Sequence, residues 1–186
     1  MKCAFSVFIA LLFVATGCGH FGFVHGQQST TRVEHFDKLL FERTFCFGKC
    51  PCYKLTVDGG GRVEFEGGQW VEAKGRQTSV LSNNQMAELT RALNQADFLS
   101  LRDKYMDTED GCPTWWTDNP SVIITLVVNG KEKMIRHDYG CRYKGSRGVD
   151  GNVFPEGLTR LESRIDEIIG TAKWIGSSPE PKMPSM

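Results

Sequence analysis

The residues with the most chemical potential in this sequence are three clustered cysteines, Cys46, Cys50 and Cys52. Thiols so close together can form a structural disulfide, exchange disulfides with another protein, or bind a soft metal such as Cu(I) or Zn(II). The usual redox motif has two residues between its cysteines and begins a helix, whereas three residues separate Cys46 from Cys50. The cluster also lacks the paired Cys-x-x-Cys knuckles of structural zinc sites. We therefore expect a structural disulfide.

Within this cluster, local spacing favours a bridge between Cys46 and Cys50. Four residues of separation form a tight loop, in which Gly48 relaxes the backbone. Strand alternation turns Cys52 away from the main core, so we expect Cys52 to be the free thiol. The competing arrangement is a Cys46–Cys52 bridge that leaves Cys50 free.

Two further cysteines, Cys112 and Cys141, lie on either side of a predicted hairpin over residues 122–137. Their positions place both of them at the open end of that hairpin. A bridge there closes a long irregular loop, which is where a disulfide stabilises most in the chain-entropy model. We therefore expect Cys112–Cys141 as the second disulfide.

The remaining polar residues form no recognisable catalytic set. His137 stands next to Asp138 and near Asp118, but the sequence has no Gly-x-Ser-x-Gly, no phosphate-binding loop and no His-Glu-x-x-His motif. We interpret His137 as a strand-end histidine that caps a loop, and Asp118 as a turn residue. The pair Trp115-Trp116 is either an exposed binding patch or a lid over the core. The sequence thus favours a non-enzymatic role without a cofactor or a metal.

The amino terminus has the pattern of a secretory signal. Met1-Lys2 is a short basic region, and residues 3–15 are apolar except for Ser6. This run is shorter than the ~20 apolar residues of a membrane-spanning helix. Its length and its flanks are those of a signal peptide.

The cleavage site decides whether the chain keeps a lipid. Residues 15–18, Ala-Thr-Gly-Cys, resemble a lipobox, so we expect a lipoprotein signal over residues 1–17 and lipidation of Cys18. Ordinary cleavage after Gly26 is the alternative. Either route leads to the periplasm or the cell envelope, where an oxidising environment lets thiols pair.

The charge balance bears on the class of partner. Lys+Arg and Asp+Glu both number 22, so the formal net charge is +0. Such a chain has no overall field to attract nucleic acid or an anionic membrane surface. We expect an envelope partner or ligand of unknown identity, no nucleic acid, and membrane contact through a lipid anchor only.

Composition and periodicity divide the rest of the chain. Residues 18–33 read as a tether, residues 34–175 as a single domain, and the Pro/Ser-rich residues 176–186 as a disordered tail. Within the domain, alternation predicts strands over residues 39–46, 53–57, 63–65, 70–74, 122–128 and 131–137.

Local signals complete the predicted fold. Asn129-Gly130 is typical of a type I′ hairpin turn. Ser82 with Gln85 resembles a capping box at the start of a helix, and a second helix follows Pro155. The order of elements predicts an α+β fold, with an antiparallel sheet built from hairpins and two amphipathic helices packed on one face.

The residues around the cysteine cluster resemble a known family. Residues 43–53, Arg-Thr-Phe-Cys-Phe-Gly-Lys-Cys-Pro-Cys-Tyr, are similar to the R-T-x-C-F-G-x-C-P-x-Y signature of a bacterial exported family, domain of unknown function 6438. The resemblance continues in residues 58–61, 63–67, 117–120, 129–131 and 161–166. It implies a secreted or lipid-anchored domain with no established activity or cofactor. Cys52 stands where the family usually has an apolar residue, which also marks it as the odd thiol.

Together these observations favour a non-catalytic, envelope-associated binding or accessory module of an exported lipoprotein. The alternatives use Cys46, Cys50 and Cys52 for thiol–disulfide exchange or for soft-metal binding.

Overall fold

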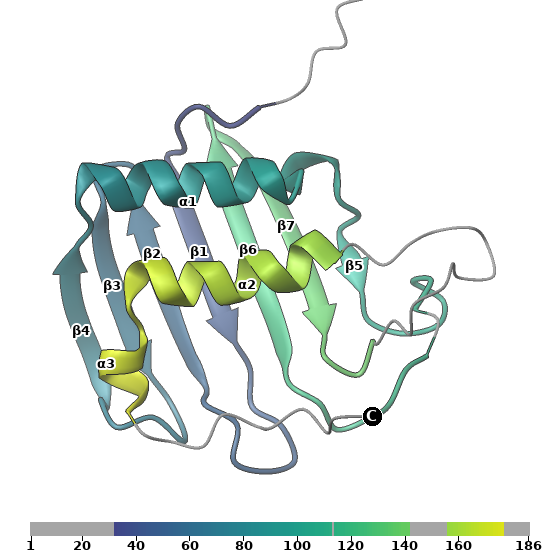
Figure 1. The fold of residues 1–186 in the computed structure, drawn as a ribbon. Helices are drawn as coiled ribbons and strands as arrows, with labels where there is room; N and C mark the ends of the chain where they lie inside the picture. The colour runs from purple at the N-terminus through teal and green to yellow at the C-terminus, as the bar shows by residue number, and fades with distance from the viewer. Residues whose placement is uncertain (1–31, 113, 142–155, 177–186) are drawn as a thin grey trace, which may run out of the picture. The chain divides into compact units, whose positions relative to one another are not determined.

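In the computed structural model of this chain, seven strands of the described residues form one sheet, in the order β4-β3-β2-β1-β6-β7-β5 (Figure 1). All neighbouring strands are antiparallel except β5 and β7, which run parallel. The strands are β1 (Lys38–Arg43), β2 (Tyr53–Asp58), β3 (Arg62–Gly67), β4 (Gly75–Val80), β5 (Lys104–Tyr105), β6 (Ser121–Val128) and β7 (Lys131–Asp138).

The structure describes residues 32–112, 114–141 and 156–176. They all belong to one of the chain's two compact units, Thr31–Met186. The predicted signal peptide, the predicted lipidation site Cys18 and residues 177–186 of the predicted tail lie outside the described residues. No helix within the described ranges combines the length and the apolar character needed to cross a membrane.

Two long helices, α1 (Asn83–Gln95) and α2 (Glu156–Ile169), lie across the same face of the sheet (Figure 1). The short elements η1 (Phe98–Ser100) and α3 (Ala172–Ile175) follow α1 and α2 in the chain. This arrangement confirms the predicted α+β fold. The antiparallel sheet forms one layer and the two amphipathic helices form the other.

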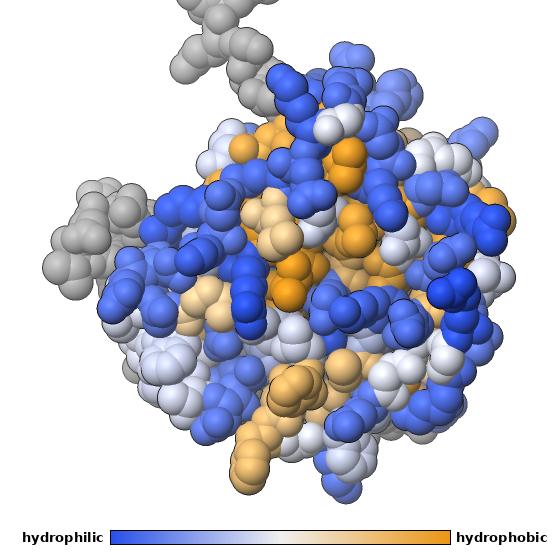
Figure 2. Space-filling view, turned by 180° about the vertical axis from the view of Figure 1, so that it is seen from behind, coloured by the Kyte–Doolittle hydropathy of each residue, from blue (hydrophilic) through white to orange (hydrophobic). Residues whose placement is uncertain are grey.

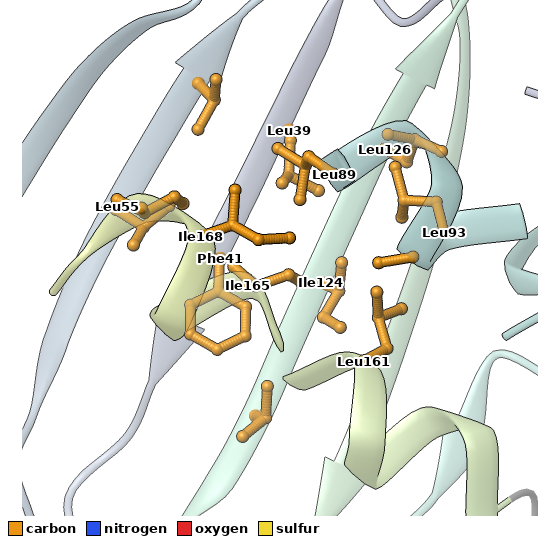
Figure 3. Packing of buried hydrophobic residues seen from close by; sticks show 14 of the residues in the cluster. Leu39, Phe41, Leu55, Leu89, Leu93, Ile124, Leu126, Leu161, Ile165 and Ile168 are labelled. Atoms are coloured by element: carbon orange, nitrogen blue, oxygen red, sulfur yellow. The ribbon is translucent and has the colours of Figure 1, made fainter. Parts of the chain in front are cut away.

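The core lies between these two layers (Figure 3). Successive side chains of a strand point to opposite faces, so every second strand residue points toward the helical layer. Full burial of a Leu, Ile or Phe side chain stabilises the fold by roughly 1.5–3 kcal/mol. The labelled core residues are Leu39, Phe41, Leu55, Ile124 and Leu126 from the strands, and Leu89, Leu93, Leu161, Ile165 and Ile168 from the helices.

The predicted capping box begins α1. Ser82 Oγ accepts a hydrogen bond from Gln85 N at 3.3 Å, and Gln85 Oε1 accepts one from Ser82 N at 3.0 Å. These bonds satisfy amide groups that the first turn of a helix otherwise leaves unpaired. Gln85 Nε2 also donates to the Ile168 carbonyl at 2.7 Å, and this bond links α1 to α2.

The predicted hairpin turn joins β6 to β7. Asn129 and Gly130 both have positive φ, 51° and 72° respectively. A type I′ turn requires positive φ at both central residues, and its twist matches that of the flanking strands. The register of β6 and β7, from Ser121 opposite Asp138 to Val128 opposite Lys131, follows from this two-residue connection.

Two predicted strand positions are wrong. The first strand was expected over residues 39–46, but β1 ends at Arg43 because the chain turns into the loop that the Cys46–Cys50 bridge closes. The strand expected over residues 70–74 is a loop, since Trp70 has φ of 56°, a value outside the extended region. Strand β4 lies just beyond it and gives little alternation signal because its residues are mostly polar.

Candidate functional site

Three loops leave the same end of the sheet, because the strand ends are in register. Arg43, the last residue of β1, pairs with Tyr53 of β2 and with Val122 of β6. We call this part of the molecule the loop end. Its loops are residues 44–52 between β1 and β2, residues 68–74 between β3 and β4, and residues 114–120 before β6.

Backbone hydrogen bonds hold the three loops against one another. Phe47 N donates to the Asp118 carbonyl at 3.3 Å, which joins the first loop to the third. Cys52 N donates to the Gln69 carbonyl at 2.9 Å, which joins the first loop to the second. The β1–β2 loop therefore lies between the other two.

Several aromatic side chains at the loop end are exposed. Phe47 is 93% exposed and Phe45 is 70% exposed, although both are apolar. Lys49 Nζ lies 5.6 Å from the centre of the Trp70 ring, a cation–π distance. We call the five exposed aromatic residues of these loops the aromatic surface; they are Phe45, Phe47, Trp70, Trp115 and Trp116.

The pair Trp115-Trp116 thus belongs to an exposed patch. Trp116 N donates to the Gly140 carbonyl at 3.1 Å, and this bond fastens the third loop to the end of β7. The Trp116 carbonyl comes so close to Gly140 that a side chain at position 140 has no room. A glycine is needed here because the two backbones approach each other closely.

Two disulfides brace the loops. Cys46 is joined to Cys50 within the β1–β2 loop, with their Cα atoms 5.8 Å apart. Cys112 is joined to Cys141 at the open end of the β6–β7 hairpin, with a Cα separation of 5.2 Å. The structure therefore holds the two pairs that the spacing favours, and Cys52 is a free, half-buried thiol.

These bridges bear on the metal and redox interpretations of the cluster. The Cys46–Cys50 bond leaves one thiol, Cys52, in place of the three thiolates that a soft-metal site would use. Among the described residues, no group of three or more His, Cys, Asp and Glu side chains is arranged to hold a metal ion.

A largely buried polar network fastens the base of the β1–β2 loop to α2. Arg43 Nη2 lies 2.7 Å from Asp166 Oδ2, and Arg43 Nε donates to the same oxygen at 2.9 Å. Asp166 Oδ1 accepts from the Tyr53 hydroxyl and, at 2.8 Å, from Thr171 Oγ1. Arg43 Nη1 also donates to the Tyr139 hydroxyl at 2.5 Å. The two residues that flank the loop, Arg43 and Tyr53, therefore share one carboxylate.

This environment changes the acid–base behaviour of the network. Burial alone lowers the pKa of Arg43, but the charge of Asp166 and the neighbouring tyrosines hold that pKa well above its usual value. Burial, together with the Asp166 charge, raises the pKa of Tyr53 well above its usual value, although Arg43 acts in the opposite direction. Burial and the Glu162 carboxylate raise the pKa of Tyr139 against the same opposing effect of Arg43. Both phenols therefore stay protonated at neutral pH.

His137 has a partner that the sequence analysis did not identify. Its Nδ1 atom lies 2.8 Å from Glu162 Oε1, and the two side chains are only 4% and 0% exposed. Asp138, which stands next to His137 in the chain, points to the other face of the sheet. There its Oδ1 accepts from Gly140 N and caps the loop, and its Oδ2 accepts from Ser121 Oγ. Asp118 has φ of 67° and occupies a turn, as expected.

A sequence signal for Glu162 and Asp166 does exist. The apolar stripe of α2 repeats at Leu158, Leu161 and Ile165, with helical spacing. Glu162 is four residues after Leu158 and three before Ile165, so it falls on the face that packs against the sheet. Asp166 follows Glu162 by four residues and lies on the same side. An acidic residue inside a buried stripe requires a partner, because burial of an unpaired charge is very costly.

The loop end therefore has two layers with different roles. The lower layer is the polar network around Arg43 and Asp166, whose hydrogen bonds hold strand ends and α2 together. The upper layer is the aromatic surface, which has apolar area to offer to another molecule. Binding by aromatic contact is the chemistry that this arrangement supports best, because exposed aromatic residues on braced loops are typical of recognition sites.

Fold and loops define an α+β domain with one helical layer and a disulfide-braced loop end. Residues 37–169 match the family described as Domain of unknown function (DUF6438), and the chain belongs to that family. No curated protein is similar enough to the chain to count as a match.

Proposed function

We propose that this chain is a non-catalytic binding module of the bacterial cell envelope, and that it recognises a partner protein through the aromatic surface. The observation that carries the proposal is the exposure of Phe47, which is 93% exposed at the tip of a disulfide-closed loop. Exposed apolar patches on a folded domain commonly mark interaction sites. Aromatic side chains supply the largest share of binding energy at many protein interfaces.

The bracing of the loops supports this role. Ordering a flexible loop on binding costs conformational entropy, and a loop already held in place avoids that cost. Here Cys46–Cys50 closes the first loop, and hydrogen bonds from Phe47 and Cys52 attach it to its neighbours. The aromatic side chains therefore meet a partner already positioned.

The position of the aromatic surface fits a tethered protein. Residues 32–37 lie at the opposite end of the sheet, where Asp37 Oδ2 accepts from Gly130 N at 2.8 Å. A tether that leads into these residues joins the domain at the end away from the loop end. On a lipid-anchored chain, the aromatic surface would face the periplasmic space and its proteins.

The shape of the surface favours a protein partner with an apolar pocket. A protruding phenylalanine fills a pocket, whereas a sugar ring is usually held by stacking in a groove. The nearby Lys49 and Asp118 supply charges of both signs, which suit the polar rim of a protein interface.

Site-specific photo-crosslinking in living cells tests the proposal. Phe47 is replaced by the photoreactive amino acid p-benzoylphenylalanine, and the protein is irradiated in the intact envelope. We expect a discrete cross-linked species that contains one envelope protein. The same replacement at Val80 is the matched control, because Val80 is apolar and 74% exposed but lies at the other end of the sheet.

The cross-linked species from the two positions decide between the outcomes. A species seen from position 47 and absent from position 80 supports the proposal, provided that Trp116→Ser reduces its yield while Val80→Ser does not. Equal labelling from both positions, or labelling of lipid alone, contradicts it.

The export part of the proposal rests on the signal pattern, and two disulfides fit a chain that matures in an oxidising compartment. Metabolic labelling with a radioactive fatty acid tests the anchor. We expect label on the parent chain and none on Cys18→Ala. An unlabelled parent chain would instead favour ordinary cleavage after Gly26.

Thiol–disulfide exchange is the second candidate function, and one observation favours it. The free thiol of Cys52 lies two residues from Cys50, whose sulfur is in the Cys46–Cys50 bond. Thiol titration of the native protein in increasing dithiothreitol separates the candidates. A bridge that opens well before Cys112–Cys141 supports exchange, and a resistant bridge with one reactive thiol supports the structural role.

A further inference from the structure

The second face of the sheet, opposite α1 and α2, has an apolar centre. Figure 2 shows this face from behind, with hydrophobic residues in its middle and hydrophilic residues around them. Leu40 of β1 pairs with Thr125 of β6, which pairs in turn with Met134 of β7. We call this line of paired residues across the sheet the central row. Met134 is 49% exposed, and Ile123 and Val127 are half-buried beside this row. Successive side chains of a strand point to opposite faces. The neighbours of these residues in each strand point toward the helices, so these side chains point away from the helices.

Charged residues stand on both sides of the central row in a regular way. On β1, Lys38 and Glu42 lie two residues before and two residues after Leu40, on the same face. Strands β2, β3, β6 and β7 repeat this arrangement of opposite charges, or of two apolar residues, around the central row, whereas the edge strand β4 carries Arg76 and Val80 at these positions. The pairs are Lys54 and Asp58 on β2, Glu66 and Arg62 on β3, Glu132 and Arg136 on β7, and Ile123 and Val127 on β6.

The strand register sorts these residues into two lines across the sheet. Glu42 pairs with Lys54 on one side and Ile123 on the other, which defines the first line. Lys38 pairs with Asp58 and Val127, which defines the second line. On β1, β2, β3 and β7, each charge in the first line therefore has the opposite charge in the second line, while Arg76 of the edge strand β4 has Val80.

We propose that this face binds a second copy of the same chain, in a symmetric dimer with its two-fold axis along the central row. A rotation of 180° about that axis places the first line of one copy over the second line of the other. Each charge of the two lines on β1, β2, β3 and β7 then meets its opposite, and Ile123 meets Val127. A symmetric interface of this kind must be self-complementary, and this face is.

Contacts within one copy do not account for the pattern. Lys54 Nζ lies 3.3 Å from Glu42 Oε2, so neighbouring strands do form ion pairs sideways. Sideways pairing needs charges that alternate along each line. It is satisfied equally well whether the two residues of one strand, one in each line, carry the same sign or opposite signs. On β1, β2 and β3, and again on β7, the two lines carry opposite signs at the same strand, which is the arrangement that the dimer requires.

The size of the face sets the expected strength. Five strands at ~4.8 Å spacing and five residues at ~3.3 Å per residue cover roughly 400 Å² per copy. Stable interfaces bury about 800 Å² per partner, so a weak, reversible dimer is expected. Glu64 lies on the central row, so the rotation places it opposite Glu64 of the second copy. This contact between like charges weakens the dimer further.

Charge reversal with rescue tests the dimer. The dissociation constant of the purified, processed chain is measured by sedimentation equilibrium, in density-matched detergent where a lipid is present. Lys38→Glu places like charges opposite Glu42 of the second copy, and Glu42→Lys does the same opposite Lys38. Because symmetry repeats the contact, each single variant should weaken the dimer about tenfold. The double variant K38E/E42K restores opposite charges across the axis and should return to within about threefold of the parent chain.

The rescue distinguishes the dimer from sideways pairing. Both single variants and the double variant lose the pairing with Asp58 or Lys54 within one copy, so sideways effects should add up rather than cancel. The control Glu88→Lys breaks an exposed ion pair with Arg164 on the helical side and should leave dimerisation unchanged. A chain that stays monomeric up to about 1 mM, or a double variant weaker than either single one, overturns the proposal.

Discussion

Arg43 at the end of β1 and Asp166 in α2 form an ion pair at 2.7 Å, although 123 residues separate them in the chain. Asp166 also accepts a hydrogen bond from Tyr53, the first residue of β2. One carboxylate of α2 thereby holds both ends of the loop that carries Phe47. This bond therefore fixes the base of the β1–β2 loop, which carries Phe45 and Phe47 of the aromatic surface.

Asp166→Asn should destabilise the fold by about 2–4 kcal/mol, because it leaves the largely buried Arg43 guanidinium without its counter-charge. Chemical denaturation with urea measures the loss. The control is Glu167→Gln, which removes an exposed ion pair with Arg164 one position further along α2. That change should stay within about 0.5 kcal/mol, since exposed pairs contribute little. Equal effects of the two changes would contradict the role assigned to Asp166.

Stability should fall as the pH rises above about 10. Both Tyr53 and Tyr139 have a pKa in the folded chain that is raised above the ordinary value of 10.0. Above pH 10 the unfolded chain can release these protons while the folded chain keeps them. The stabilisation is therefore complete below pH 10 and is lost as the pH rises, by up to ~1.4 kcal/mol per pH unit for each phenol.

The measurement is a denaturation series between neutral and alkaline pH, together with the ultraviolet absorbance of phenolate. Tyr53→Phe should reduce the pH dependence even though it lowers stability at neutral pH. Phenolate absorbance from all four tyrosines near pH 10 in the folded chain would refute this account.

The two disulfides should differ in their contribution to stability. Replacement of both Cys112 and Cys141 by serine opens a bridge with a sequence separation of 29, which should cost about 3–4 kcal/mol in the chain-entropy model. Replacement of Cys46 and Cys50 opens a separation of 4 and should cost about 2 kcal/mol. Peptide mapping without reduction checks the pairs themselves. A fragment that joins Cys46 to Cys112 would refute this connectivity.

Substitutions at Gly130 should depend on backbone conformation rather than on space. A Cβ atom at Gly130 meets nothing within 4 Å, but φ of 72° strains most side chains. Gly130→Val should cost about 1–3 kcal/mol, because a β-branched residue is strained at positive φ. Gly130→Asn should be milder, since asparagine tolerates this conformation. Thermal unfolding compares the two variants, and equal losses would point to a cause other than φ.

Much of the fold was predictable because its signals are local. Alternation in residues 53–57 and 122–128, the Ser82–Gln85 capping box and the Asn129-Gly130 turn depend on residues close together in the chain. The α+β fold follows from the order of such segments. Strand β4 escaped detection because an edge strand with mostly polar residues needs no apolar alternation.

The sequence by itself determined the types of element and the tight hairpin, and it favoured two cysteine pairs while leaving a Cys46–Cys52 bridge as the alternative. Only the tertiary structure decided that Glu162 meets His137, that Asp166 joins Arg43 to Tyr53, and that aromatic residues of three loops share one surface. Each of those contacts depends on the order of strands in the sheet and on the position at which α2 crosses it. Local propensity does not encode these relationships, because they arise when distant segments pack together to bury a common core.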